Sequence, residues 1–459
     1  MEILKKISRP IDMTTGKPWE KILFFAMPML IGNIAQQLYN AVDSAIVGKY
    51  VGDNALAAVG GAGPILNLLI ALFIGIGAGA GITVSQCFGA HKRDELSKLI
   101  GSCIFLVGMA SLFIMTFASL VARPMLILLN TPESIIDWSH SYLLILFIGS
   151  SGAAFFNILS GVLRGLGDSV SGLLYLLISS VIHIVLDLLF VKQFHMGVNG
   201  VALATVLSQG VSAVLCIRKL RRMTDFFDFK ISYIKWNKKY ASSIIRLGLP
   251  SGVTQMIMSM AMIIVQSLTN SYGEMFIAAN VMVTRVDGFA MLPNTSFGNA
   301  LTTYAGQNMG AGSYERVEKG AKQGCILAVA TSAIITLAIL IFGRSLMGIF
   351  TDTESLIDLS MSLMRIMAAG YIAMAIIQTL SGAMRGAGDT MTPMWISILV
   401  TFVIRVPLAY GLTYLSRSPE LPNGNREYIY ISLLISWVLG AIINLLIYRK
   451  GKWKNRGIR

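Results

Sequence analysis

Charged side chains are scarce in this chain. Asp, Glu, Lys and Arg make up 13% of its 459 residues, whereas soluble proteins average about 25%. Apolar residues make up 55% and gather in runs of about 20 residues, the length that crosses a hydrocarbon core of roughly 30 Å. This composition excludes a soluble multidomain enzyme and a disordered chain. It predicts an all-α integral membrane protein.

Several motifs that carry chemistry are also missing. The four cysteines stand apart, without the spacing of a disulfide framework or a zinc site. The glycine-rich run 75–81 lacks the GK[ST] ending of a phosphate loop and lies inside an apolar run, so we interpret it as a surface for close helix packing. No Walker motif occurs in the sequence, which argues against a primary pump. We therefore expect no enzyme activity, no metal and no cofactor other than a coupling ion.

The apolar runs predict twelve membrane spans. They lie at 22–47, 55–82, 99–121, 140–162, 170–192, 198–217, 242–270, 276–300, 322–343, 361–383, 393–415 and 427–448. Of the 37 Lys and Arg residues, the outer loops between these spans hold only Lys49, Arg123, Lys192, Arg344, Arg417 and Arg426. Because basic residues crowd cytoplasmic loops, we expect a multi-pass protein of the plasma (inner) membrane with both termini in the cytoplasm. The net charge of +14 then reflects topology and not nucleic-acid binding.

The sequence also contains an internal repeat. The segment 160–168 (SGVLRGLGD) recurs at 381–389 (SGAMRGAGD), and 133–137 (ESIID) recurs at 354–358 (ESLID). In the same register, Gln86, Gly89 and Ala90 match Gln307, Gly310 and Ala311. We therefore predict a duplicated six-span unit, with an N-lobe at 1–217, a basic cytoplasmic linker at 218–240 and a C-lobe at 241–459. Two such bundles can rock about a fixed site, as in many transporters.

Ionisable side chains inside the predicted spans are few. Each costs about 2.5–3.5 kcal/mol on insertion scales and is therefore a functional candidate. In the N-lobe they are Asp43, His183 and Asp187, and the last two lie one helical turn apart on one face. A desolvated carboxyl group favours its neutral form and can load a proton, whereas carboxylates with amide and hydroxyl oxygens also suit hard cations. Interhelical hydrogen bonding is the alternative role.

The motifs in this order resemble the multidrug and toxic compound extrusion (MATE) family over essentially the whole chain. The residues that carry the resemblance are the paired RGxGD turns, the QxxGA turns after spans two and eight, and 42–48 (VDSAIVG) at the end of span one. Membership would imply a MATE-like, V-shaped pair of pseudo-symmetric six-helix lobes. It would also imply export of bulky, often cationic amphiphiles in exchange for protons or sodium ions.

The resemblance implies a coupling site in the N-lobe. It places Asp43 and Asp187 at this site, with Gln36, Asn157 and Thr205 as nearby polar partners. The family commonly has asparagine where this chain has His183. An imidazole at that position could relay protons, or it could hydrogen-bond Asp187.

The C-lobe does not repeat these acids. Ile264 and Val265 stand opposite Asp43, and Leu408 stands opposite Asp187, so we do not expect ion coupling there. Asp287 either attracts a cationic substrate or pairs with Arg405 or Arg285. The residues that we predict for substrate binding are Asp287, Arg285, Met256, Met260, Met291, Gln255 and Gln378. The methionines can repack around varied ligands, and lipid-facing packing explains them equally well.

The two RGxGD turns join Arg164 to Asp168 and Arg385 to Asp389. Glycine permits unusual backbone angles there and each aspartate can cap the next helix, so we expect a structural role, with gating as the alternative.

The sequence thus favours a monomeric secondary antiporter that exports amphiphilic, often cationic compounds by alternating access. Its partners would be small molecules and membrane lipid, and no nucleic acid. A flippase for a lipid-linked saccharide or another amphiphile is the alternative. A flippase needs a broadly basic cavity, and the three intramembrane acids argue against one.

Overall fold

The computed structural model describes residues 10–129 and 131–455. Within these ranges the regular structure is helical, apart from an isolated bridge between Ser418 and Leu421. Ten helices are long and apolar enough to cross a membrane, and the number reaches twelve when each of two bent pairs counts as one span. The predicted all-α membrane fold is therefore confirmed.

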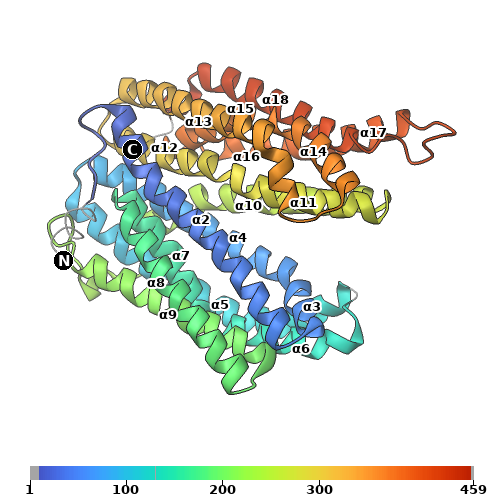
Figure 1. Cartoon of the computed structure of the whole chain (residues 1–459). Coiled ribbons are helices and arrows are strands. Elements are labelled where there is room, and N and C mark those ends of the chain that lie inside the picture. The colour runs from blue at the N-terminus through green and yellow to red at the C-terminus, as the bar shows by residue number, and fades with distance from the viewer. Residues whose placement is uncertain (1–9, 130, 456–459) are drawn as a thin grey trace. The chain divides into compact units, whose positions relative to one another are not determined.

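Figure 1 shows the helices of both repeats. The first repeat contains α2 (Pro18–Tyr50), α3 (Asp53–Gly61), α4 (Gly63–Gly89), α5 (Arg93–Leu128), α6 (Glu133–Ile148), α7 (Ser150–Gly165), α8 (Ser169–Asp187), the π-helix η1 (Leu188–Gln193) and α9 (Gly197–Arg221). The linker carries the short η2 (Ile231–Tyr233). The second repeat contains α10 (Lys238–Asn270), α11 (Glu274–Ala290), α12 (Leu292–Gly310), α13 (Tyr314–Gly348), α14 (Glu354–Ala368), α15 (Tyr371–Gly386), α16 (Met391–Ile398), the π-helix η3 (Leu399–Arg405), α17 (Val406–Leu415), α18 (Tyr428–Arg449) and η4 (Lys452–Asn455).

The fourth span of each repeat is bent. α6 and α7 meet at 53°, and α14 and α15 meet at 42°. A glycine lies at each break, Gly149 in the first repeat and Gly370 in the second. Glycine lowers the cost of leaving helical geometry, which is consistent with a break at the same place in both repeats.

The chain forms two compact units, and two of the three boundaries between them fall inside helices. The first unit comprises Met1–Asp12 and Pro28–Gly252, and the second comprises Met13–Met27 and Val253–Arg459. The predicted lobes instead divide the chain on either side of the linker, so the units differ from them in two short segments. Helix α2 passes from the second unit into the first at Pro28. Helix α10 passes from the first unit into the second after Gly252, two residues beyond Pro250. A proline inside a helix removes a backbone hydrogen bond and weakens the helix at that position.

The segment Met13–Met27 is bonded to other helices of the second unit. The backbone N–H of Met13 donates to Gln307 Oε1 at 2.9 Å, and Asn308 Nδ2 donates to the carbonyl of Met13 at 3.1 Å. Further along, the backbone N–H of Trp19 donates to Gln323 Oε1 at 3.1 Å. These bonds join the segment before Pro28 to α12 and α13.

The internal repeat is visible in the helix packing. Helix α4 packs on α7 and helix α12 packs on α15. A Cβ atom built on Gly161 would lie 2.2 Å from the carbonyl oxygen of Gly77, and one built on Gly382 would lie 2.2 Å from that of Gly298. The two pairs occupy corresponding places in the repeat. Glycine therefore lets the helix backbones come into direct contact at the same crossing in both halves.

The repeated ESxID segments contribute corresponding ion pairs. In the first repeat Arg123 pairs with Asp137 at 3.2 Å. In the second, Arg344 pairs with Asp358 and also with Glu354. Since these groups are exposed to solvent, the pairs contribute little to stability.

The two RGxGD turns have matching geometry. Gly167 and Gly388 have φ values of 88° and 94°, a region that strongly favours glycine. Asp168 Oδ1 accepts from the backbone N–H of Ser171 at 2.9 Å, which caps α8. Asp389 Oδ1 accepts from the N–H of Thr392 at 3.3 Å. Each turn therefore holds the start of the following helix.

Candidate functional site

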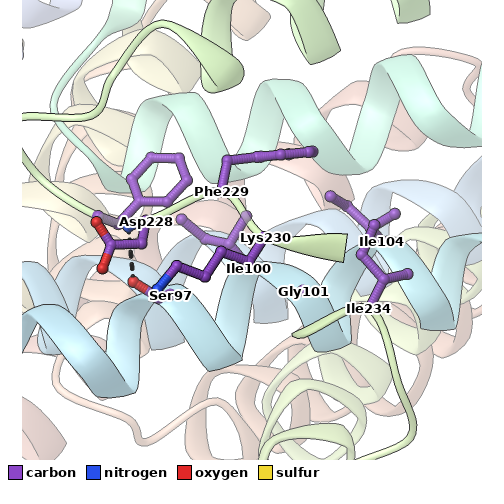
Figure 2. A pocket seen from close by; sticks show the side chains of 9 residues that line it. Ser97, Ile100, Gly101, Ile104, Asp228, Phe229, Lys230 and Ile234 are labelled. Carbon is purple, nitrogen blue, oxygen red and sulfur yellow. Dashed lines mark hydrogen bonds between the residues drawn. The ribbon is translucent and has the colours of Figure 1, made fainter. Parts of the chain in front are cut away.

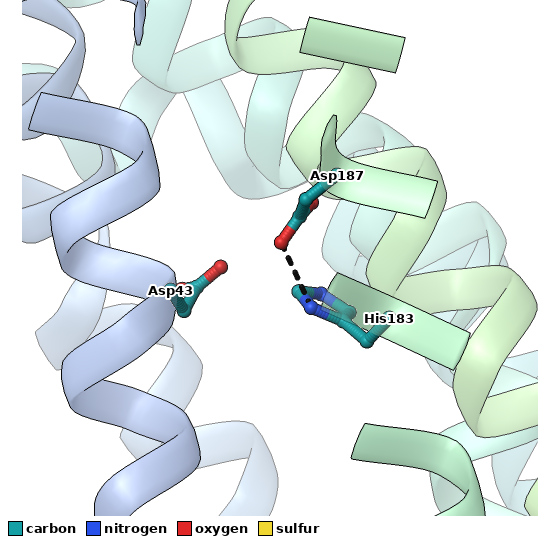
Figure 3. A group of neighbouring side chains, drawn as sticks. All are labelled: Asp43, His183 and Asp187. Carbon is teal, nitrogen blue, oxygen red and sulfur yellow. Dashed lines mark ion pairs between the residues drawn. The ribbon is translucent and has the colours of Figure 1, made fainter. Parts of the chain in front are cut away.

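Three ionisable side chains of the first unit converge on one point. Asp43 projects from α2 toward His183 and Asp187, which share a face of α8 (Figure 3). Each residue offers one ligating atom, and these atoms all lie within 4.8 Å of one another. The structure thus brings together the three intramembrane groups of the first repeat that the sequence singled out.

His183 links Asp187 to α9. Its Nδ1 lies 2.9 Å from Asp187 Oδ2, and its Nε2 lies 2.9 Å from Thr205 Oγ1. The hydroxyl of Thr205 in turn donates to the carbonyl of Val201 at 3.0 Å. The imidazole is therefore held by polar groups on both of its nitrogen sides.

The group is buried and short of hydrogen bonds. His183 is 1% exposed and Asp187 is 0% exposed, while Asp43 is half-buried. Four buried polar atoms of the group have no hydrogen-bond partner: Asp43 Oδ1, His183 Nδ1 and both carboxylate oxygens of Asp187. The close approach of His183 to Asp187 is thus out of line for a hydrogen bond. Because burying unpaired polar atoms is costly, this arrangement favours a bound proton or cation among these groups.

The backbone changes character directly after Asp187. Asp187 is the last residue of α8, and the π-helix η1 begins at Leu188. Single π-turns inside membrane helices are rare and occur often at functional sites. The corresponding helix of the second repeat also contains a π-helix, η3, which ends at Arg405.

Two of the predicted polar partners make no polar contact with this group among the described residues. The amide of Asn157 donates to the carbonyl of Ala153 in its own helix at 2.9 Å. Gln36 is exposed, and no polar contact joins it to the group among the described residues. Thr205 is the predicted partner that makes a direct contact.

The sequence analysis missed two tyrosines. The Tyr39 ring meets His183 edge-to-face, with the ring centroids 5.0 Å apart. Tyr142, which is buried in α6, lies close enough to Asp43 and Asp187 to interact with them electrostatically. Tyr39 precedes Asp43 by one helical turn, so the spacing could have identified it. Nothing in the sequence indicates Tyr142, because its position depends on how α6 packs.

The second unit contains a different polar group around Asp287. Asp287 forms no ion pair with Arg405 or Arg285 within the described part of the chain, which differs from the pairing that we considered. Arg405 still interacts with Asp287 electrostatically, from a position at the end of η3. Asp287 Oδ1, Arg405 Nε and Tyr371 Oη are all buried without a hydrogen-bond partner. Arg285 is exposed, and its role in substrate binding stays a prediction.

The remaining predicted substrate residues are spread over the second unit. Gln255 and Met260 are exposed, and Met256, Met291 and Gln378 are half-buried. Among the described residues, no hydrogen bond joins any of their side chains to Asp287. They lie on α10, on α15 and, for Met291, between α11 and α12, so substrate binding stays a prediction.

Comparisons with known proteins give a consistent result. The model of the MatE family matches residues 28–189 and 250–411, once in each repeat. A probable multidrug resistance protein of Bacillus subtilis, YoeA, is 28% identical over 416 residues, which cover 89% of this chain and 90% of that protein. A second B. subtilis protein of the same description, YpnP, is 28% identical over 445 residues, covering 96% and 97%. A crystal structure of a MATE protein in complex with MaL6 superposes with a TM-score of 0.89 at 24% identity, covering 96% of this chain and 98% of that one.

Proposed function

The chain belongs to the MatE family, and we propose that it is a secondary antiporter that exports amphiphilic, often cationic compounds in exchange for protons. The relatives YoeA and YpnP, which are described as probable multidrug resistance proteins, support the substrate class. The protein would work as a monomer in the plasma membrane, with both termini in the cytoplasm.

The observation that supports proton coupling is the arrangement of polar contacts around His183. The hydroxyl proton of Thr205 goes to Val201, so the Thr205 oxygen accepts from His183 and Nε2 carries a hydrogen. In the neutral imidazole Nδ1 is then an unprotonated acceptor. It faces an acceptor oxygen of Asp187 at 2.9 Å. Two acceptors this close repel each other unless a proton or cation reduces their negative charge, and a single proton on the carboxyl group or on the imidazole does so.

The same contacts disfavour sodium as the coupling ion. A hard cation of this kind is held by several oxygen atoms. The Thr205 oxygen is engaged by His183, and the Asn157 amide bonds within its own helix. Asp43 and Asp187 therefore supply the carboxylate oxygens with little help from neutral oxygens, whereas a proton needs only the acceptors already present.

Antiport follows from a change of charge. When the group holds its coupling proton, its net negative charge falls and the unpaired oxygens are satisfied. When the proton leaves, the uncovered carboxylates of Asp43 and Asp187 favour a cationic substrate or a new proton. Each ligand therefore promotes release of the other, and alternating access by two bundles would convert this exchange into export.

The test is uptake of a fluorescent organic cation into inverted vesicles. A pH gradient and a sodium gradient are imposed separately on the wild type, Asp43→Asn and Asp187→Asn. We expect uptake driven by the pH gradient in the wild type and loss of it in both variants. Asp137→Asn is the control, because this exposed carboxylate pairs with Arg123 outside the buried group.

Membrane expression and thermal stability of each variant show whether the protein folds. Full uptake by both folded variants would contradict coupling through Asp43 and Asp187. Uptake with the sodium gradient alone would contradict proton coupling. Lipid movement in liposomes without cation uptake would favour the flippase.

A further inference from the structure

The linker after α9 lies along one side of α5. Four residues of α5 spaced four apart contact it or lie beside it: Arg93, Ser97, Gly101 and Phe105. Residues four apart form a stripe on one helix face, and this stripe is about 18 Å long. The linker therefore runs along α5 (Figure 2).

Hydrogen bonds and an ion pair hold the linker at the N-terminal end of this stripe. Arg93 donates to Asp228 Oδ1 at 2.8 Å and to the carbonyl of Thr224 at 2.8 Å. The backbone N–H of Asp228 donates to Ser97 Oγ at 2.8 Å. These bonds fix the linker where it meets α5.

Close packing holds the linker at the other end of the stripe, near Gly101 and Phe105. A Cβ atom built on Gly101 would lie 2.2 Å from the carbonyl oxygen of Tyr233, so only glycine lets the linker backbone approach this helix. The Trp236 ring meets Phe105 with the centroids 6.4 Å apart. Phe227 is 1% exposed in the core of the first unit, which ties the same segment inward.

The outer side of the segment combines apolar and basic side chains. Ile231 is 77% exposed and Trp236 is 55% exposed. Lys230, Lys235 and Lys238 are exposed as well. Tryptophan and lysine are the residues that favour the boundary between lipid headgroups and hydrocarbon.

The position along α5 gives the depth of this surface. Charged residues occupy the first turns of α5, and its apolar run begins near Leu99. Phe105 lies about 9 Å further along the helix axis. Trp236, which packs on Phe105, therefore lies beside the outer part of this apolar run. The long side chains of the neighbouring lysines can extend from there to headgroup level.

The charges around the segment leave it positive. Asp94 pairs with Lys98, Asp228 pairs with Arg93, and Glu95 pairs with Lys92 and Lys239. Within the described residues, Lys230, Lys235 and Lys238 form no ion pair, and Asp225 is the nearby acid without one. The surplus positive charge is therefore available to an anionic ligand.

We propose that residues 230–238 form a binding site for anionic phospholipid, with Ile231 and Trp236 in the acyl boundary and Lys230, Lys235 and Lys238 on the headgroup phosphate. The docking stripe on α5 holds this surface at a fixed depth. Basic residues next to a membrane attract anionic headgroups, and each contributes roughly fivefold in affinity. This inference does not depend on which compound or ion the protein transports.

Quenching of Trp236 by brominated lipid tests the proposal. The full-length protein is reconstituted in phosphatidylcholine vesicles that contain brominated phosphatidylglycerol or brominated phosphatidylcholine. The Trp236 signal is the difference between the wild type and Trp236→Phe, since the chain has six tryptophans. We expect half-quenching at a several-fold lower fraction of phosphatidylglycerol than of phosphatidylcholine.

Charge and docking variants show the origin of this preference. Lys230→Gln with Lys235→Gln should remove most of it, because these two lysines supply most of the attraction to the anionic headgroup. Lys49→Gln with Lys192→Gln is the control, because these lysines lie beside Tyr50, away from the linker. Gly101→Ala should abolish the preference by displacing the segment, whereas Gly108→Ala should keep it, since nothing lies within 4 Å of a Cβ atom at Gly108.

Equal quenching by the two brominated lipids would overturn the proposal, because the charge of the headgroup would then not matter. Absence of quenching by either lipid would overturn it as well, because Trp236 would not reach the acyl chains. Transport is not measured in this experiment, so its outcome is separate from that of the efflux assay.

Discussion

His183 Nδ1 and Asp187 Oδ2 lie 2.9 Å apart across one turn at the end of α8. Both side chains are almost fully buried, and the carboxyl group of Asp43 faces them from α2. A proton bound among two carboxylates and one imidazole makes the net charge of the group less negative. The proposed antiport rests on this property, because occupancy by a proton changes the charge that a cationic substrate meets.

Replacing His183 by asparagine, the residue common in the family, tests the role of the imidazole. The amide cannot share a proton with Asp187, so we expect His183→Asn to lower pH-driven uptake by roughly tenfold or more. The initial rate of cation uptake is measured as a function of pH. His140→Asn is the control, since His140 lies outside the buried group. An unchanged pH profile in a folded His183→Asn protein would show that the imidazole does not take part.

The glycine contacts of the repeat predict matched losses of stability. Gly161→Ala and Gly382→Ala each place a Cβ atom 2.2 Å from a carbonyl oxygen of the neighbouring helix. Such overpacking costs about 1–3 kcal/mol, so the thermal midpoint in detergent should fall in both variants. Gly60→Ala serves as the control, because its Cβ atom would meet nothing within 4 Å. A midpoint that falls in one repeat only would mean that the two crossings are not equivalent.

Asp287→Asn tests substrate recognition in the second unit. Asp287 keeps a buried carboxylate oxygen without a partner, which can accept a charge-assisted hydrogen bond from a cationic substrate. Such bonds contribute about 1.5–3 kcal/mol, so we expect the KM for organic cations to rise at least about tenfold. The pH dependence of uptake should stay the same. Asp358→Asn is the control and should leave the KM unchanged, because this exposed carboxylate pairs with Arg344. An equal KM for Asp287→Asn and wild type would exclude Asp287 from the substrate site.

The docking of the linker predicts a response to acid. The hydrogen bond from Arg93 lowers the pKa of Asp228, which lies outside the membrane spans. A lowered pKa in the folded state stabilises docking above the ordinary aspartate pKa, and this contribution is lost as the pH falls through the lowered value. Hydrogen exchange of the Asp228 amide, which bonds to Ser97, should accelerate relative to core amides in that acidic range and in Arg93→Gln. Because both groups are exposed, high salt should have a similar effect. Protection that is independent of pH and Arg93 would show that packing at Gly101 alone holds the linker.

Much of the fold could be predicted from the sequence, because its signals are local or periodic. Apolar runs of bilayer length specify the spans, and the ESxID and RGxGD segments recur because the same ion pairs and helix caps occur in both repeats. The sequence also predicts which ionisable side chains of one helix share a face. His183 and Asp187 share a face because they lie one turn apart.

The contacts between helices were decided only by tertiary structure. Asp43 lies near His183 because α2 packs beside α8. Asn157 and Gln36, which the family resemblance grouped with Asp43, make no polar contact with it among the described residues. Tyr142 reaches the group from α6, and Asp287 stops short of an ion pair with Arg405. The sequence by itself determined which charges enter the membrane, since each has a large transfer cost. Only packing determined which of them meet, because rotation and bending of each helix depend on the neighbours against which it is buried.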